Sequence, residues 1–217
     1  MKPAIRMSSM MNLPVLYIFT HDSITVGEDG PAHHPIEQLA SLELIPNLKV
    51  YRPYDLNELI GSYMEIMKEK SPSALVLPRD NKKISNDTKI SGVEDGIYLV
   101  RNTEYEDYIN LISNGEELGI TLKLSENLES IGIHANVYSA PCLKNAKESI
   151  KEKLSGENTI AITLGVKNYY FELTKKVISI DEFSISGKKQ ELLDYFGFNE
   201  QELESKILEI LNKENKN

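Results

Sequence analysis

The sequence predicts an α/β protein built mainly on parallel sheets. Short runs rich in Val, Ile, Leu and Tyr alternate with amphipathic segments along the 217 residues, which is the order of elements that builds such sheets. These apolar runs are nearly continuous rather than alternating with polar residues. Continuous runs are typical of parallel strands buried on both faces.

Eight strands are expected, each a short apolar run bounded by polar or turn-forming residues. They are Val15–Thr20, Leu48–Arg52, Ala74–Leu77, Ile97–Arg101, Tyr108–Ile112, Ala135–Tyr138, Ile160–Leu164 and Val177–Ile180. The last five are expected to be separate strands of a second, mostly parallel sheet.

Six helices are expected around these strands, because apolar residues recur there at helical spacing. They are Ile36–Leu42, Asn57–Lys68, Glu116–Ile131, Lys144–Leu154, Lys188–Phe196 and Glu200–Asn212. Asp55 and Asn199 are the expected N-caps of the second and the last of these helices.

The polar stretch Asp80–Gly96 has no apolar period and is rich in charged residues, Asn, Ser and Gly. Such composition predicts a connection between two domains. The chain therefore divides into an N-terminal unit, residues 1–92, and a C-terminal unit, residues 93–217.

Composition excludes several classes of partner. The net charge is −9 and the lysines are mixed among acidic residues, whereas nucleic acids and anionic membranes both require a basic face. The longest apolar run is too short to span a bilayer. A single cysteine, Cys142, excludes an internal disulfide and any cysteine-based zinc site, and a reducing, cytoplasmic setting is the simplest interpretation.

The segment Phe19–Glu37 concentrates the residues that can carry chemistry. It follows a predicted strand and holds three of the four histidines together with acidic residues, Gly and Pro. Ligands of open α/β sheets bind beyond the carboxyl ends of strands, where this loop should lie. Imidazoles and carboxylates there suit recognition of a polyhydroxylated substrate and proton transfer near neutral pH.

Two other interpretations of this loop stay open at the level of composition. In the first, it is a surface loop whose His and Asp side chains satisfy turn backbone. In the second, His33, His34 and Asp29 bind zinc, although adjacent histidines point in different directions on most backbones.

The same segment resembles the transketolase signature. It reads THDSI at residues 20–24 and GEDGP at residues 27–31, followed by His33, Pro35 and Glu37. Further similarities, strong before Arg79 and looser after it, cover nearly the whole chain, among them PSAL at residues 72–75 and YSAPC at residues 138–142. The resemblance implies the end of a pyrimidine-binding thiamine-diphosphate domain, followed by a Rossmann-like C-terminal domain.

The resemblance also implies roles for four side chains. His33, the catalytic candidate, would lie near the aminopyrimidine of thiamine diphosphate and the carbonyl of the donor sugar. Asp29 would bond a sugar hydroxyl. His21 and Arg79 would hold the sugar phosphate, with Arg79 supplying a planar, permanently charged fork. His134 and Cys142 carry no functional assignment, because both are expected to pack near buried strands.

Parts of the family pattern are absent or altered. The Gly-Asp-Gly motif that binds magnesium and the diphosphate does not occur, and the chain begins at residues that resemble the middle of a family helix. Neither thiamine diphosphate nor magnesium is therefore expected on this chain alone. Seven positions depart from the family residue given in parentheses: Thr25 (Gly), Ala32 (Thr), His34 (Gln), Pro78 (Ser), Asp80 (Gln), Thr163 (Glu) and Ser184 (Gly).

Three histories would produce such a chain: a fragment of an ordinary transketolase, one subunit of a split enzyme, or a non-catalytic paralogue that serves as an interaction module. The first is the preferred hypothesis. The family activity is transfer of a two-carbon ketol unit between sugar phosphates in the pentose phosphate pathway, and this chain alone is expected to be inactive. Its expected partners are the missing N-terminal part or a second subunit, in a homo-oligomer whose apolar face is covered.

Overall fold

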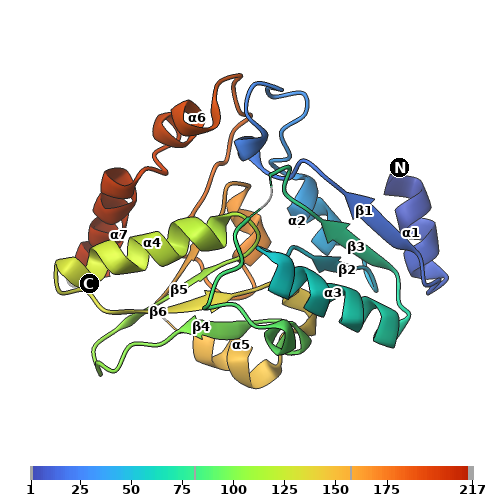
Figure 1. The fold of residues 1–217 in the computed structure, drawn as a ribbon, viewed down its shortest axis with the longest axis horizontal. Coiled ribbons are helices and arrows are strands. Elements are labelled where there is room, and N and C mark those ends of the chain that lie inside the picture. The colour runs from blue at the N-terminus through green and yellow to red at the C-terminus, as the bar shows by residue number, and fades with distance from the viewer. Residues whose placement is uncertain (1, 81, 157, 215–217) are drawn as a thin grey trace.

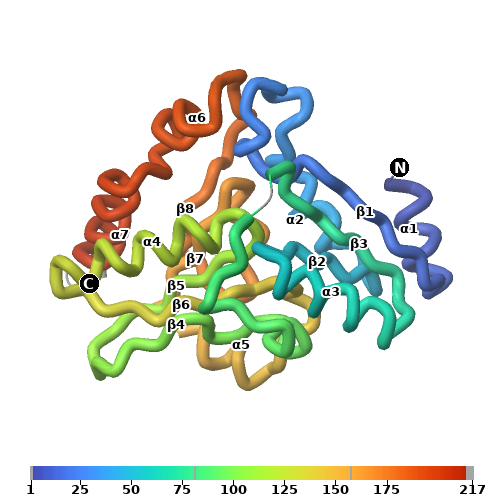
Figure 2. The backbone as a smooth tube through the Cα atoms, viewed as in Figure 1, coloured from blue at the N-terminus to red at the C-terminus, as the bar shows by residue number. Residues whose placement is uncertain are grey.

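The computed structural model describes residues 2–80, 82–156 and 158–214. It confirms the α/β class, with two sheets of mainly parallel strands (Figure 1). The smaller sheet belongs to the N-terminal half of the chain and the larger sheet to the C-terminal half, and the tube in Figure 2 shows the two halves side by side.

The smaller sheet has three parallel strands in the order β1-β3-β2. Its elements are α1 (Lys2–Met10), β1 (Leu16–Phe19), α2 (Gln38–Glu43), β2 (Lys49–Tyr51), α3 (Leu56–Glu69) and β3 (Ser73–Val76). Each strand ends within one residue of its predicted bounds. Since β1 and β3 are parallel neighbours, the segments that follow them leave the sheet at the same edge.

The larger sheet has five strands in the order β4-β6-β5-β7-β8, with β4 antiparallel to β6 and the other pairs parallel. Its elements are β4 (Tyr98–Arg101), β5 (Ile109–Ser113), α4 (Glu117–Ser130), β6 (Ala135–Ser139), α5 (Glu148–Leu154), β7 (Thr159–Ile162), β8 (Val177–Ile178), α6 (Lys189–Tyr195) and α7 (Glu200–Glu214). The five predicted strands therefore all occur, and α4 and α5 cover opposite faces (Figure 1).

One helix begins four residues later than predicted, whereas the bounds of the others lie within two residues of the prediction. The helix expected over Lys144–Leu154 begins only at Glu148, and Leu143–Asn145 forms a 3-10 turn instead. The Nζ of Lys144 donates to the carbonyls of Ile45 and Leu48, each at 2.7 Å. These bonds hold the start of the segment against the N-terminal unit, which explains why tertiary contacts override the helical pattern there.

Both predicted N-caps are confirmed. The Asp55 carboxylate accepts from the backbone N–H of Glu58 at 3.2 Å, and the Asn199 amide oxygen accepts from the N–H of Glu202 at 3.0 Å. Each side chain satisfies one N–H that the first helical turn leaves without an intrahelical partner.

The polar stretch between the units is partly packed against the N-terminal unit. Its residues Ile90–Asp95 form 3-10 turns against α3, and Val93 is fully buried. The Thr88 hydroxyl donates to the Asp55 carboxylate at 2.6 Å. Part of the connection is therefore folded onto α3, while residues such as Lys83, Ile84 and Asn86 stay exposed.

The two sheets share one apolar core. A single cluster joins Leu39, Val50 and Ala74 of the smaller sheet region to Ile112 and Ala161 of the larger sheet. The N-terminal unit is thus completed on one side by the C-terminal unit, and the loop after β1 lies near their junction.

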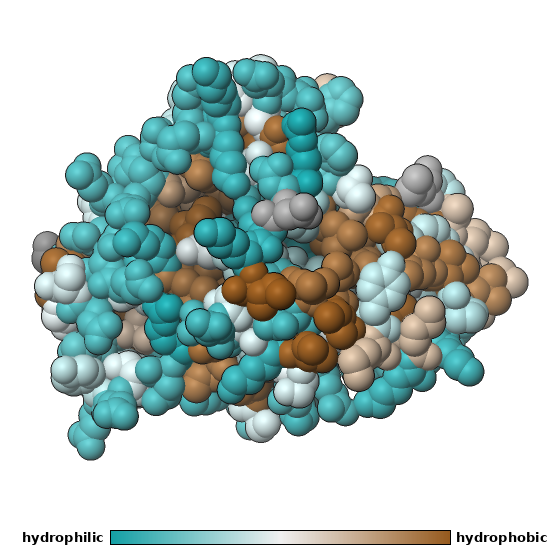
Figure 3. Space-filling model, in the orientation of Figure 1, coloured by the Kyte–Doolittle hydropathy of each residue, from teal (hydrophilic) through white to brown (hydrophobic). Residues whose placement is uncertain are grey.

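The other side of the N-terminal unit is apolar and exposed. Among the described residues, β1 is one of the two outer strands of its sheet and pairs with β3. Large apolar side chains of α1, β1, α3 and the α1–β1 connection are exposed, and Figure 3 shows apolar residues gathered over this side of the molecule. We call them the open face: Met7, Met10, Met11, Leu13, Ile18, Ile60, Tyr63, Met64 and Met67.

No helix in the described part of the chain is long and apolar enough to cross a membrane.

Candidate functional site

The loop between β1 and α2, residues 20–37, starts at the carboxyl edge of the smaller sheet. The N–H of Asp22 donates to the Leu77 carbonyl at 3.1 Å, which ties the loop to the chain leaving β3. Ile24 and Ile36 of the loop are buried in an apolar cluster of the C-terminal unit. The loop is therefore anchored in both units, as a rigid site at their junction requires.

The backbone of this loop turns sharply at several residues. His21 and Ser23 have positive φ values of 65° and 71°, in the left-handed region that side chains other than Gly rarely adopt. At the tip, Gly30 has φ 74° and its carbonyl accepts from the N–H groups of both His33 and His34, each at 3.1 Å. The tip is thus a closed turn that presents these two histidines in fixed directions.

His21 and His33 line one cavity of about 270 Å³ at the carboxyl edge of the smaller sheet. Its wall is largely apolar, contributed by Phe19, Leu39 and Val76 among others. Both imidazoles are on exposed residues, so the cavity opens beside two groups that can donate or accept a hydrogen bond. The structure therefore brings together two of the four residues named from the sequence.

Asp29 and Arg79 are not among the residues that line this cavity. Arg79 is exposed beyond the end of β3, and its Nη1 donates to the Val26 carbonyl of the loop at 3.2 Å. Asp29 is exposed at the loop tip, where its carbonyl oxygen lies 3.3 Å from His33 Nδ1. A shared anion site for His21 and Arg79 remains a prediction: they follow neighbouring parallel strands but do not line one cavity.

The arrangement of the loop does not favour the zinc alternative. His34 is buried and its Nδ1 is hydrogen-bonded to the Ser184 hydroxyl at 2.5 Å, whereas His33 is exposed. In residues 2–80, 82–156 and 158–214 no group of three or more His, Cys, Asp or Glu side chains could hold a metal ion.

Sequence reasoning missed a buried charge network below the loop. The Arg52 guanidinium, 1% exposed, donates to Asp22 at 2.6 Å, to Glu117 at 2.8 Å and to the Asn114 side chain at 2.9 Å. Burial acts to lower the pKa of Arg52, but the two carboxylates outweigh it and raise the pKa. Burial raises the pKa of Glu117, and the charge of Arg52 opposes that rise.

The sequence contained one indication of this network, but it did not identify the residues that pair. Arg52 ends a predicted buried strand, and Asp22 follows the candidate His21 directly. An Arg at such a position needs a carboxylate partner, since a buried unpaired charge is too costly. Its partners lie 30 and 65 residues away, beyond the reach of local patterns.

A second polar cluster ties the loop to the C-terminal unit. The nearly buried Glu116 carboxylate accepts from the Thr25 hydroxyl and forms ion pairs with Lys82 and Lys189. Burial acts to raise the pKa of Glu116, but its bonds to the two lysines and Thr25 outweigh burial and lower the pKa. Thr25, one of the departures from the family pattern, is thus a contact between the units.

The remaining singled-out residues stay outside the site. Cys142 is fully buried, and burial raises the pKa of its thiol to about 12, which makes it a poor nucleophile. His134 stacks on Tyr105 with ring centroids 3.4 Å apart.

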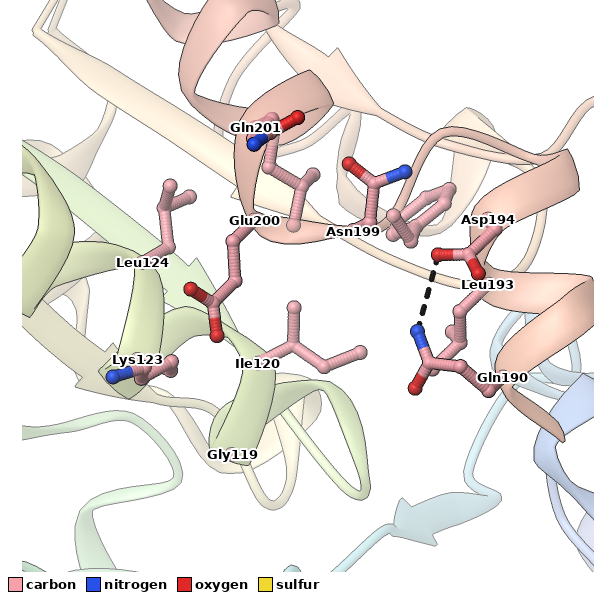
Figure 4. Close-up of a pocket in the computed structure, with 12 residues that line it drawn as sticks. Gly119, Ile120, Lys123, Leu124, Gln190, Leu193, Asp194, Asn199, Glu200 and Gln201 are labelled. Carbon is pink, nitrogen blue, oxygen red and sulfur yellow. Dashed lines mark hydrogen bonds between the residues drawn. The ribbon is translucent and has the colours of Figure 1, made fainter.

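A larger cavity of about 650 Å³ lies between α4, α6 and α7, away from the loop (Figure 4). Ile120, Leu124 and Leu193 contribute apolar surface, and Glu200 and the bonded pair of Gln190 and Asp194 contribute polar groups. None of the four candidate residues lines it.

Comparison with known proteins supports the resemblance noted in the loop. Residues 1–83 match the family model described as the transketolase pyrimidine-binding domain, and residues 96–199 match the transketolase-like C-terminal domain. The transketolase of Bacillus subtilis is 36% identical over 228 residues, which cover 98% of this chain and 34% of that protein. The chain belongs to the transketolase family.

Solved structures of transketolases have the same fold. The Campylobacter jejuni enzyme superposes with a TM-score of 0.82 at 32% identity, over 96% of this chain and 33% of that one. A chain described as a split-gene transketolase, an inactive beta4 tetramer, superposes with a TM-score of 0.79 at 19% identity, over 97% of this chain and 72% of that one. The present chain spans about one third of the length of the curated transketolases that it matches.

Intact transketolases use thiamine diphosphate with a divalent metal ion. The Gly-Asp-Gly motif that the family resemblance assigns to the metal and the diphosphate does not occur in this sequence. No step through the cofactor is therefore assigned to this chain alone.

Proposed function

We propose that this chain forms the C-terminal part of a transketolase and contributes to ketol transfer between sugar phosphates only together with the rest of that enzyme. The observation that carries the proposal is the cavity at the carboxyl edge of β1 and β3, where His21 and His33 of the signature loop meet. The boundary between the two domains is proposed at residues 92 and 93.

In this proposal the four candidate side chains keep the roles that the family resemblance implies. His21 donates a hydrogen bond to the sugar phosphate, and Arg79 adds charge and further N–H groups besides the Nη1 that bonds Val26. Asp29 accepts from a sugar hydroxyl, and His33 lies beside the donor carbonyl. Asp80, exposed and next to Arg79, offsets part of the positive charge and weakens phosphate binding.

The cofactor would be bound mainly by polypeptide outside this chain. Thiamine diphosphate and magnesium supply the carbanion chemistry of the intact enzymes. The open face and the free edge of β1 are where such a polypeptide would dock, because exposed edges and large apolar patches seldom stay uncovered in soluble proteins. A homo-oligomer would cover the same face.

The test compares the purified chain with a mixture. The chain alone should show no ketol transfer between xylulose 5-phosphate and ribose 5-phosphate and no magnesium-dependent binding of thiamine diphosphate. Adding a polypeptide that carries the N-terminal two thirds of a transketolase should produce transfer. Turnover by the pure chain would refute the need for a partner.

A second candidate function is a non-catalytic interaction module. The open face and the departures at Thr25 and Ser184 favour it, since they concern contacts rather than chemistry. This alternative would be supported by a mixture that forms a stable complex but shows no ketol transfer. Replacing His33 by Ala should then leave the affinity of the complex unchanged.

A further inference from the structure

The C-terminal unit frames the candidate loop although it supplies none of the four candidate residues. Residues 179–188, which connect β8 to α6, run beside the loop near the top of Figure 1. The Ser186 hydroxyl donates to the Glu28 carbonyl at 2.8 Å, and the N–H of Val166 donates to the Ile36 carbonyl at 3.2 Å. Both ends of the loop tip are therefore held from outside the N-terminal unit.

The contact at the centre of this frame joins two buried side chains. His34 and Ser184 are each 3% exposed, and Nδ1 of the imidazole lies 2.5 Å from the Ser184 hydroxyl oxygen. The other ring nitrogen, Nε2, is buried as well. Ser184 supplies the side chain that orients this imidazole, and the Gly27 backbone interacts with the same ring.

The surroundings of His34 favour its neutral form. Burial lowers its pKa, and the neighbouring His33 acts in the same direction, while the Gly27 backbone and the Asp29 charge oppose them. A neutral imidazole can either accept from a hydroxyl or donate to it, so the contact with Ser184 persists in either tautomer.

Both partners of this contact depart from the family pattern, which has Gln at position 34 and Gly at position 184. A Gly at 184 has no side chain to reach residue 34. The two departures therefore meet in one hydrogen bond.

We propose that Ser184 is a positioning residue for the candidate site: by holding His34 inside the protein, it fixes the exposed direction of His33. The catalytic relevance of this inference rests on the proposed function, whereas its test does not. The link is short, because the N–H groups of His33 and His34 share the Gly30 carbonyl as acceptor. Loosening the His34 ring therefore loosens the turn that carries His33.

The experiment uses the full chain and measures amide hydrogen exchange together with the NMR chemical shifts of the His33 imidazole. In Ser184→Ala, exchange at the amides of His33 and His34 should accelerate about tenfold, the effect of losing one buried hydrogen bond to local opening. The ring resonances of His33 should move, while amides of the larger sheet keep their protection.

A further variant acts as a control. Ser155→Ala removes an exposed hydroxyl that donates to the Glu152 carbonyl at 2.8 Å, far from the loop, and should leave both amides unchanged. Unchanged exchange in Ser184→Ala, or a uniform acceleration across the chain, would overturn the proposal.

The outcome is independent of whether the chain supports catalysis. If no mixture shows ketol transfer, the proposed function fails while the exchange result still stands. If transfer occurs, Ser184→Ala should lower kcat more than it raises KM for the phosphorylated acceptor, because His33 is displaced while His21 and Arg79 are not.

Discussion

The N-terminal unit has two sides that differ in how they are completed. Toward the C-terminal unit, even charged groups are buried and bonded: the Glu58 carboxylate accepts from the Tyr98 hydroxyl at 2.8 Å and the Ser139 hydroxyl at 2.5 Å. On the open face, Met10 and Met67 are 62% and 64% exposed. One side of the N-terminal unit is thus covered by residues of the same chain, whereas the other leaves large apolar side chains exposed, as interaction surfaces do.

The largest effect should come from breaking the completed side at Arg52. Replacing Arg52 by Leu leaves Asp22 and Glu117 buried without a countercharge, which should lower the free energy of unfolding by about 3–5 kcal/mol. Urea unfolding measures this loss.

Arg101→Leu is the matched control for this change. Its ion pairs with Asp87 and Glu126 are partly exposed, so the loss should be far smaller. Equal losses in the two variants would show that burial of the Arg52 network is not decisive.

The next effect concerns pH and the carboxyl of Glu43, which has one buried oxygen without a hydrogen-bond partner among the described residues. Burial raises the pKa of Glu43 from its ordinary 4.5 to about 7, with the charge of Lys144 opposing and that of Glu172 adding. The folded state then holds a proton that the unfolded state releases. The resulting stability is fully present below pH 4.5 and is lost as the pH rises to about 7.

Glu43→Gln isolates this contribution because its side chain does not titrate. Between pH 4.5 and 8, the free energy of unfolding of the unaltered chain should fall relative to this variant by about 3 kcal/mol. Parallel pH profiles for the two proteins would contradict the raised pKa.

A smaller effect is expected on the open face. The double variant Met64→Lys with Met67→Lys places two charges on exposed positions of α3. It should weaken self-association, or binding to an N-terminal transketolase polypeptide, by about tenfold or more, because charged side chains are disfavoured at interface cores. Sedimentation velocity measures the change. Lys replacements at the exposed Tyr105 and Phe171 of the C-terminal unit should have no such effect.

The smallest effect should come from a helix cap away from both sides. Asn199→Ala removes the acceptor for the Glu202 N–H and should cost about 1 kcal/mol in thermal or urea unfolding. A loss of unfolding free energy as large as that of Arg52→Leu would show that Asn199 stabilises more than the first turn of α7.

The sequence predicted those parts of the molecule that depend on local pattern. Continuous apolar runs located all eight strands, and Asp55 and Asn199 were recognised as caps because capping is a contact between near neighbours. The helix at Lys144 was predicted too long, since the bonds of its side chain to Ile45 and Leu48 are tertiary contacts.

The candidate site was predictable only in part, for the same reason. The signature loop could be located, and His21 and His33 do share a cavity. The supports of that loop, Arg52 and Ser184, act across 30 and 150 residues of chain. No periodicity or spacing within a window reveals such pairs.

The left-handed backbone at His21 carries a consequence for how this loop can change. A side chain with a β-carbon is disfavoured at φ 65°, by about 1 kcal/mol or more, and Gly would relieve that conformational penalty. Gly would also delete the imidazole that enters the cavity. Stability therefore favours Gly at this position, whereas an intact site favours His. The residue at this position in a relative would indicate which of the two requirements dominates there.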